Sequence, residues 1–248
     1  MEHIYSKEFQ LRYFEMDKFG MASPTAILTL LEETAADHCH LIEHDLYSLE
    51  NQNIGWVLIS GSINMKRYPK YKEIIKIQTW LSKFSLVKGY RENLIIDEGN
   101  NIIGMAKGVW VFYDIQNRKP VPVFDDIKTK WSVNSSITAE IDIKLIKPIL
   151  SGIPEREFDV QRNDVDSNKH VNNIKYFHWL LESLPEEISE KYVLETITAK
   201  FYSDAKYGDR ILVYADKNSE DNSFSHAIKS TINNKTLAGA YSKWRRAG

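Results

Sequence analysis

The feature that most constrains the fold of this chain is an internal repeat. The residues FQLRYFEMDKFGMASP align with FDVQRNDVDSNKHVNN, and two shorter matches follow in the same order. The matched pairs of segments are 9–24 with 158–173, 70–77 with 206–213, and 105–111 with 239–245. Three collinear matches favour duplication over chance. We therefore expect two copies of one structural unit in the chain.

Each copy contains a helical segment followed by four runs with the alternating or β-branched character of strands. Ser23 is a suitable N-cap with Pro24 at the first helical position, and helical spacing continues to residue 46. Asn172 occupies the same place before the second helix, whose periodic run stops at Pro185. The strand-like runs are 55–66, 73–85, 89–98 and 101–114, then 194–203, 209–217, 223–232 and 235–245. With a further strand before each helix, this order predicts an α+β fold in which an antiparallel sheet curls around a central helix.

A proline-containing stretch, 117–140, separates the two copies and cannot continue either sheet. We expect a connector there, with a short helix near 127–131. The predicted division is an N-terminal domain at 1–130, a connector at 131–150 and a C-terminal domain at 151–248.

Composition excludes several classes of protein. The chain is 43% hydrophobic and 27% charged with a net charge of −2, so no basic field favours nucleic acid as a partner. A single cysteine, Cys39, excludes an intrachain disulfide framework and fits a reducing compartment. The first residues are too charged for a signal peptide, and no apolar run approaches the ~18 residues of a membrane span. These features predict a cytoplasmic protein.

The stretch DVDSNKHVNN, at 164–173, concentrates polar groups just before the second helix. Asp166, Asn168 and His170 are spaced by two, so an extended segment would place all three on one face. Histidine exchanges protons near neutral pH, and the helix start offers N–H groups to an oxyanion. A structural role explains the spacing equally well: Asn172 would only cap the helix, and His170 would only donate hydrogen bonds.

The segment DVDSNKHVNNIKYFHWLLE resembles the signature D-x-N-x-H-V-N-N-x-x-Y-x-x-W-x-x-E of the acyl-carrier-protein thioesterases of plant plastids and bacteria. The matching residues are Asp166, Asn168, His170, Val171, Asn172, Asn173, Tyr176, Trp179 and Glu182. The first copy, at 13–38, is similar to the family as well. The resemblance implies a tandem (double) hotdog fold, each half a long central helix wrapped by an antiparallel β-sheet. It also implies hydrolysis of fatty acyl-acyl carrier protein to free fatty acid.

In that family a carboxylate, often followed by cysteine, comes from a strand beyond the helix. AKFYSDAKYGD, at 199–209, aligns there and places Asp204 at the carboxylate and Ala205 at the cysteine. A nucleophilic cysteine is thus impossible at this position, which leaves water activated by a carboxylate. The resemblance implies that Asp204 orients or deprotonates this water, that His170 and Asn168 polarise or position the thioester, and that Asp166 holds their geometry. Which group is the base stays open.

The first copy serves as an internal comparison for the site. Asp166 corresponds to Asp17, but Asn168 corresponds to Phe19 and His170 to Met21. We therefore expect one working site per chain, in the second copy. The apolar replacements suit a first domain that binds the acyl chain, although ordinary core packing explains them equally well. Asp164, which precedes the site, is expected to be a solvated surface residue rather than a supporting carboxylate.

No cofactor or metal is expected, because the sequence contains no Gly-rich phosphate loop or metal-ligand motif. His38, His40 and His44 are interpreted as surface histidines. The expected partner is acyl carrier protein, and its docking site would be locally basic. Candidate cations are grouped at 66–72, at Lys200, Lys206 and Arg210, and at Arg245–Arg246, although strand-edge lysines would look the same.

Three other functions stay open at this stage. A coenzyme A thioesterase is the nearest alternative, followed by a non-catalytic acyl-binding module and then by a hotdog dehydratase. The polar set at 166–170 argues against the binding module, because a lipid pocket does not need it. Acyl chain length and oligomeric state, including a homodimer, are not determined by the sequence.

Overall fold

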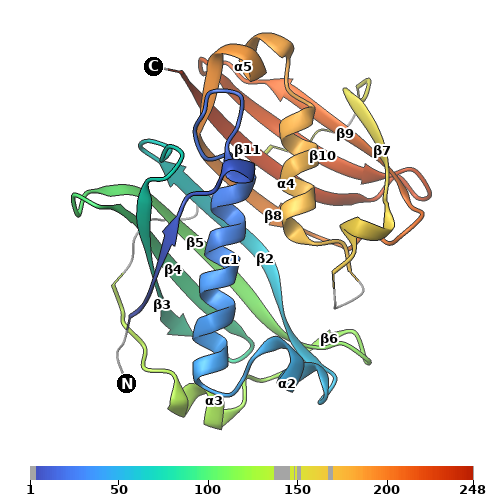
Figure 1. Ribbon diagram of the computed structural model, residues 1–248. Coiled ribbons are helices and arrows are strands. Elements are labelled where there is room, and N and C mark those ends of the chain that lie inside the picture. The colour runs from blue at the N-terminus through green and yellow to red at the C-terminus, as the bar shows by residue number, and fades with distance from the viewer. Residues whose placement is uncertain (1–3, 137–145, 148, 150–151, 167–169, 248) are drawn as a thin grey trace. The chain divides into compact units, whose positions relative to one another are not determined.

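The structure is a computed structural model that describes residues 4–136, 146–147, 149, 152–166 and 170–247 (Figure 1). The chain divides into two compact units, Met1–Glu140 and Ile141–Gly248. Trp131 packs in the core of the first unit and Ile149 in that of the second, so the ends of the predicted connector belong to different units. No helix in the described part of the chain is long and apolar enough to cross a membrane.

The first unit is an antiparallel sheet with a long helix packed against it (Figure 1). Its strands pair in the order β1-β3-β4-β5-β2, with the short β6 beside β5. The strands are β1 (Tyr5–Gln10), β2 (Ile54–Met65), β3 (Ile74–Phe84), β4 (Lys88–Asp97), β5 (Ile102–Asp114) and β6 (Lys119–Pro120). The helices are the 3₁₀ helix η1 (Tyr13–Glu15), α1 (Pro24–Leu41), α2 (Leu46–Glu50) and α3 (Asp125–Lys130). The short helix predicted near 127–131 is therefore present as α3.

The second unit repeats this arrangement with a shorter helix. Its strands pair in the order β7-β9-β10-β11-β8, which matches the first unit strand for strand. The strands are β7 (Arg156–Asp159), β8 (Tyr192–Phe201), β9 (Arg210–Lys217), β10 (Ser223–Ser230) and β11 (Thr236–Arg246). The helices are the 3₁₀ helix η3 (Arg162–Asp164), α4 (Asn173–Glu182) and α5 (Glu186–Lys191). All eight strand-like runs read from the sequence form strands whose ends lie within two residues of the prediction.

The strand register confirms the duplication residue by residue. Phe9 lies opposite Ile75 in the first unit, and Phe158 lies opposite Ile211 in the second. The sequence repeat pairs the same residues, Phe9 with Phe158 and Ile75 with Ile211. Because a shift of one residue would turn every side chain to the other face, an identical register is a demanding test of the repeat.

Helix α1 differs from its prediction in two respects. It ends at Leu41 instead of continuing to residue 46, because Glu43 adopts a left-handed conformation with φ of 61°. Asp45 is then the N-cap of the next helix, α2. The buried face of α1 also runs through Thr34 and His38. Leu41, although apolar, is exposed at the end of the helix.

A buried arginine explains why α1 turns polar residues inward. Arg91 on β4 donates to Nδ1 of His38 at 3.1 Å and to Oγ1 of Thr79 at 3.0 Å. Burial, and the charge of Arg91, lower the pKa of His38 to about 3, so this histidine is a neutral acceptor. Cys39 is a half-buried thiol whose Sγ lies 3.8 Å from Nη2 of Arg91. Burial raises the pKa of this thiol, as expected for a structural cysteine.

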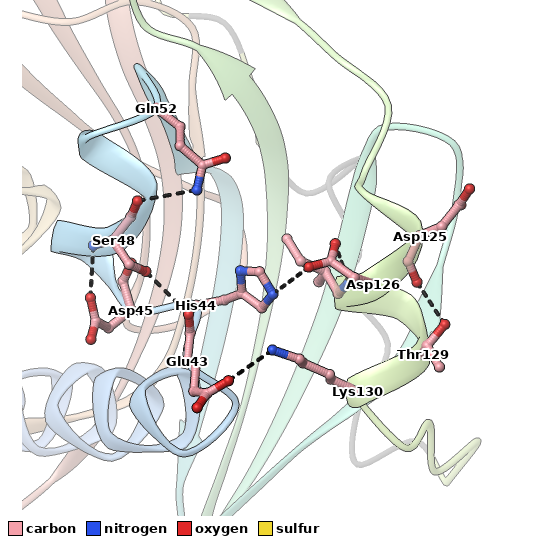
Figure 2. A network of polar contacts seen from close by, with 10 residues as sticks. Glu43, His44, Asp45, Ser48, Gln52, Asp125, Asp126, Thr129 and Lys130 are labelled. Atoms are coloured by element: carbon pink, nitrogen blue, oxygen red, sulfur yellow. Dashed lines mark hydrogen bonds and ion pairs between the residues drawn. The ribbon is translucent and has the colours of Figure 1, made fainter.

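His44 is likewise buried, so the surface interpretation is wrong for His38 and His44 and holds only for His40. Nε2 of His44 lies 2.9 Å from Oδ2 of Asp126 on α3 (Figure 2). The two groups are close enough to attract each other electrostatically, but they lack good hydrogen-bond geometry. Lys130 on α3 also pairs with Glu43 at 3.0 Å. These contacts join the turn after α1 to α3 and hold the start of the connecting segment on the first unit.

Candidate active site

The candidate site combines two segments of the second unit, the loop before α4 and the turn after β8. Nδ1 of His170 lies 3.5 Å from Oδ2 of Asp204, and the two side chains are 42% and 21% exposed. A histidine and a carboxylate that are far apart in the sequence thus meet at a position that water can reach. The predicted residues Asp166, His170 and Asp204 all belong to this region. Asn168 lies outside the described residues.

Asp166 closes the loop that presents His170. Its backbone N–H donates to the carbonyl oxygen of His170 at 2.9 Å, and its Oδ1 accepts from the His170 N–H at 3.4 Å. Val165 and Val171 form a β-bridge beside this closure. The side chain of Asp166 therefore holds the backbone at the base of His170, which fits the positioning role implied for it.

Asp164 is buried, which corrects the expectation of a solvated surface residue. Its Oδ2 accepts from the N–H of Gln161 at 2.8 Å, and its Oδ1 lies 3.1 Å from Nζ of Lys175 on α4. Its carbonyl oxygen accepts from the N–H of Asn172 at 2.9 Å. Asp164 therefore fastens η3 to the start of α4, and supports the loop between them.

Tyr176 is a supporting residue that the sequence reasoning did not single out. Its hydroxyl accepts from the backbone N–H of Ala205 at 2.7 Å and so ties the segment carrying Asp204 to α4. Burial, reinforced by the charges of Asp204 and Asp209, raises the pKa of Tyr176 and keeps it neutral. The only indication in the sequence was that Tyr176, the fourth residue of α4, matches the tyrosine of the family signature.

The start of α4 contributes less to anion binding than the sequence suggested. Oδ1 of Asn172 accepts from the N–H of Ile174 at 2.7 Å, and the carbonyl oxygen of Asn172 accepts from Lys175 at 2.9 Å. These two N–H groups are therefore occupied. What remains at this end is the positive end of the helix dipole, which favours negative charge nearby.

The first unit preserves this scaffold without the acid–base groups. Glu15 is buried like Asp164, accepts from the N–H of Arg12 at 2.6 Å, and through its carbonyl oxygen receives the N–H of Ser23 at 2.8 Å. Oδ1 of Asp17 accepts from the N–H groups of Phe19 and Met21 at 2.9 and 3.1 Å. The loop closure is thus common to both copies, and the histidine is present only in the second.

The described residues contain no group of three or more histidine, cysteine, aspartate or glutamate side chains that could hold a metal ion. His170 and Asp204 together can hold and deprotonate a water molecule and polarise a carbonyl group. The start of α4 can stabilise negative charge nearby.

Comparison with known proteins agrees with this geometry. Residues 2–131 match the model of the acyl-ACP thioesterase N-terminal domain, and residues 151–246 match that of the C-terminal domain. An oleoyl-acyl carrier protein thioesterase of Coriandrum sativum is 25% identical over 83% of this chain and 60% of its own length. A palmitoyl-acyl carrier protein thioesterase of Cuphea hookeriana is 27% identical over 80% of this chain and 51% of its own. The chain thus spans between half and two thirds of these curated relatives.

Solved structures confirm the predicted double hotdog fold. An acyl-ACP thioesterase from Bacteroides thetaiotaomicron superposes with a TM-score of 0.84 at 22% identity, covering 98% of both chains. The 12:0-ACP thioesterase from Umbellularia californica gives 0.86 at 16% identity, covering 100% of this chain and 99% of that one. With both domain models matched in order over most of its length, the chain belongs to the acyl-ACP thioesterase family.

Proposed function

We propose that this protein hydrolyses the thioester bond of fatty acyl-acyl carrier protein and releases free fatty acid. The observation that carries the proposal is that Nδ1 of His170 lies 3.5 Å from Oδ2 of Asp204 in the second unit. The corresponding positions of the first unit hold no histidine, since Met21 stands where His170 does.

In the proposed reaction, water attacks the thioester carbonyl carbon while Asp204 accepts a proton from it. The oxygen of water forms the new C–O bond, and the C–S bond breaks when the tetrahedral intermediate collapses. The departing sulfur takes a proton and leaves as the thiol of the carrier, so acid and thiol are the only products. Ala205 removes the alternative of a cysteine nucleophile beside the carboxylate.

His170 and Asn168 would position the thioester and stabilise the negative charge that develops on its oxygen. His170 is suited to this role because Asp166 fixes its backbone and Asp204 faces its Nδ1. The dipole of α4 acts in the same direction. Asp166 contacts the loop and not the substrate, so it is a positioning residue.

The carrier needs an argument of its own, because coenzyme A presents the same pantetheine thioester as acyl carrier protein. The relatives named above act, by their names, on acyl carrier protein, and this supports the protein carrier for this chain. A cytoplasmic location and the domain boundaries at 130 and 151 stay predictions. A non-catalytic acyl-binding module would not need the His170–Asp204 pair.

The test is release of fatty acid and thiol from acyl-acyl carrier protein and acyl-coenzyme A of matched chain lengths. We expect turnover of the carrier-bound substrate, and a loss of about 10²-fold or more in kcat for Asp204→Asn and His170→Ala. His178→Ala, an exposed histidine on α4, is the matched control, and Cys39→Ser should also keep its activity. Turnover of coenzyme A thioesters alone would replace the carrier assignment, and full activity of Asp204→Asn would exclude the proposed site.

A further inference from the structure

Two exposed cations adjoin the candidate site without acidic side chains to neutralise them. Arg162 is the first residue of η3, and Lys206 follows Asp204 by two residues. Within the described part of the chain, neither forms an ion pair with an acidic side chain, whereas nearby Arg210 pairs with Asp159 at 2.7 Å. Lys175 is likewise paired, with Asp164. Arg162 and Lys206 therefore differ from the neighbouring cations in having no acidic partner among the described residues.

The backbone around these cations is well anchored. The guanidinium carbon of Arg162 lies 5.1 Å from the centroid of the Tyr207 ring, so the two side chains form one surface. The N–H of Gly208 donates to the carbonyl oxygen of Val160 at 3.1 Å, which joins the two segments. The carboxylate of Asp209 accepts from the Lys206 backbone N–H at 2.8 Å, which fixes the turn. Arg162 and Lys206 are thus two cations, without ion-pair partners among the described residues, on a backbone that is held in place.

The first unit shows that this arginine is not a requirement of the fold. At the corresponding positions Tyr13 replaces Arg162 and Tyr71 replaces Tyr207, and their ring centroids lie 6.4 Å apart. The same local structure thus tolerates an aromatic pair. Lysine is present in both copies, as Lys70 and Lys206. The arginine–tyrosine pair accompanies the His170–Asp204 site and is absent from the copy that lacks it.

We propose that Arg162, Lys206 and Tyr207 bind the phosphodiester of the phosphopantetheine arm that carries the acyl thioester. This inference rests on the proposed function, because it assumes that the thioester is placed at Asp204. The phosphate is the charged group of the arm: it forms a phosphodiester with acyl carrier protein and is part of a diphosphate in coenzyme A. Arginine matches phosphate with a planar fork of donors, and lysine adds a mobile charge. The Cα atoms of Lys206 and Asp204 are at most ~7 Å apart, so the lysine side chain must extend away from Asp204 to meet a phosphate at the far end of the arm.

The test measures binding with inert thioether analogues, so its outcome does not depend on hydrolysis. We compare S-alkyl phosphopantetheine with S-alkyl pantetheine, which lacks the phosphate, by calorimetry. The wild type should bind the phosphorylated analogue more tightly by about 10-fold or more, the scale of hydrogen bonds to a charged group. The double variant Arg162→Gln/Lys206→Gln should bind the two analogues equally, with its affinity for the unphosphorylated one unchanged.

The control is Lys119→Gln/Lys217→Gln, two exposed lysines outside the candidate groups of cations, which should leave both affinities unchanged. Kinetics then compare the two carriers of the arm's phosphate: KM for acyl-acyl carrier protein and for acyl-coenzyme A should both rise in the Arg162/Lys206 variant. A rise for the carrier protein alone would mean that the cations contact its acidic surface, and would overturn the proposal. Equal binding of the two analogues by the wild type would also overturn it, whether or not the protein hydrolyses thioesters.

Discussion

Tyr176 illustrates, at the scale of one residue, how a group outside the acid–base set can control it. Its hydroxyl is the acceptor for the buried N–H of Ala205, the residue that follows Asp204. Loss of this acceptor would leave the N–H unpaired in the interior, at a cost of about 1–3 kcal/mol. It would also release the segment that directs Asp204 towards His170.

We therefore expect Tyr176→Phe to lower kcat by roughly 10-fold or more while KM changes little, because misplaced groups lose catalysis steeply. Unfolding should become easier by the cost of the unpaired N–H. Steady-state kinetics and thermal unfolding measure the two effects. Tyr47→Phe, which alters an exposed tyrosine on α2 of the first unit, is the control for kcat. Unchanged kcat in Tyr176→Phe would show that this hydrogen bond does not position Asp204.

His226 on β10 gives the second unit a pH-dependent stability. Oγ of Ser242 accepts from Nε1 of Trp244 at 2.9 Å and forms a hydrogen bond of 2.7 Å with Nε2 of His226. Burial lowers the pKa of His226 to about 3 and keeps it neutral. An unfolded chain binds this proton below about pH 6.5. The stability is thus complete above that pH and is lost as the pH falls towards 3.

His226→Gln should remove the contribution of this one proton to the pH dependence of the free energy of unfolding. That contribution is about 1.4 kcal/mol per pH unit between the pKa values of the folded and unfolded states. The free energy of unfolding in urea, measured from pH 7 to pH 4.5, should fall less steeply for the variant than for the wild type. His38 contributes with the same sign and stays in place in both proteins. His178→Gln, on the exposed face of α4, should follow the wild-type curve. Parallel curves for His226→Gln and the wild type would refute the assignment.

At the scale of elements, the duplication offers a matched pair of variants. Asp164 and Glu15 share one contact in the two units, since each accepts from a backbone N–H three residues earlier. They differ in the cation that they pair with, which is Lys175 for Asp164 and Arg12 for Glu15. Replacing either residue by alanine should lower the free energy of unfolding of its unit by about 0.5–2 kcal/mol, which is the usual cost of a lost cap. Only Asp164→Ala should reduce kcat, because only that loop carries His170. An equal loss of kcat in Glu15→Ala would mean that the rate reports stability and not the site.

The elements themselves could be read from the sequence because their signals are local. Strand alternation and the caps Ser23 and Asn172 depend on neighbouring residues, and the repeat needs only a comparison of the sequence with itself. The end of α1 could not be read, because no glycine or proline marks Glu43, which adopts its left-handed conformation without either. The burial of His38 was equally hidden, since it depends on Arg91 from a strand that is distant in the sequence.

The same distinction holds for the site. His170, Asp166 and Asp204 were identified from the family signature, and the structure brings His170 and Asp204 together. The burial of Asp164 and the bond from Ala205 to Tyr176 depend on tertiary contacts, and no spacing in the sequence encodes them. The comparison of the two copies was more informative than composition, because it separated the loop closure common to both from the histidine found in one.

At the scale of the whole molecule, two copies of one fold have diverged so that one carries the acid–base pair and the other does not. The strand orders of the two units are identical, which accounts for the match of two consecutive domain models to one chain. Divergence is concentrated in a few side chains, among them Met21 against His170 and Tyr13 against Arg162. This division predicts a single site per chain.

The central claim is that a water molecule activated at Asp204 cleaves the acyl-carrier thioester directly. The most direct measurement is a single turnover of acyl-acyl carrier protein by excess enzyme in ¹⁸O-labelled water, with mass analysis of the fatty acid. Direct attack predicts release of the acid in that first turnover with one heavy oxygen in its carboxyl group. Unlabelled acid would show that the oxygen came from a protein carboxylate through a covalent intermediate, and absence of any released acid would contradict the hydrolase assignment itself.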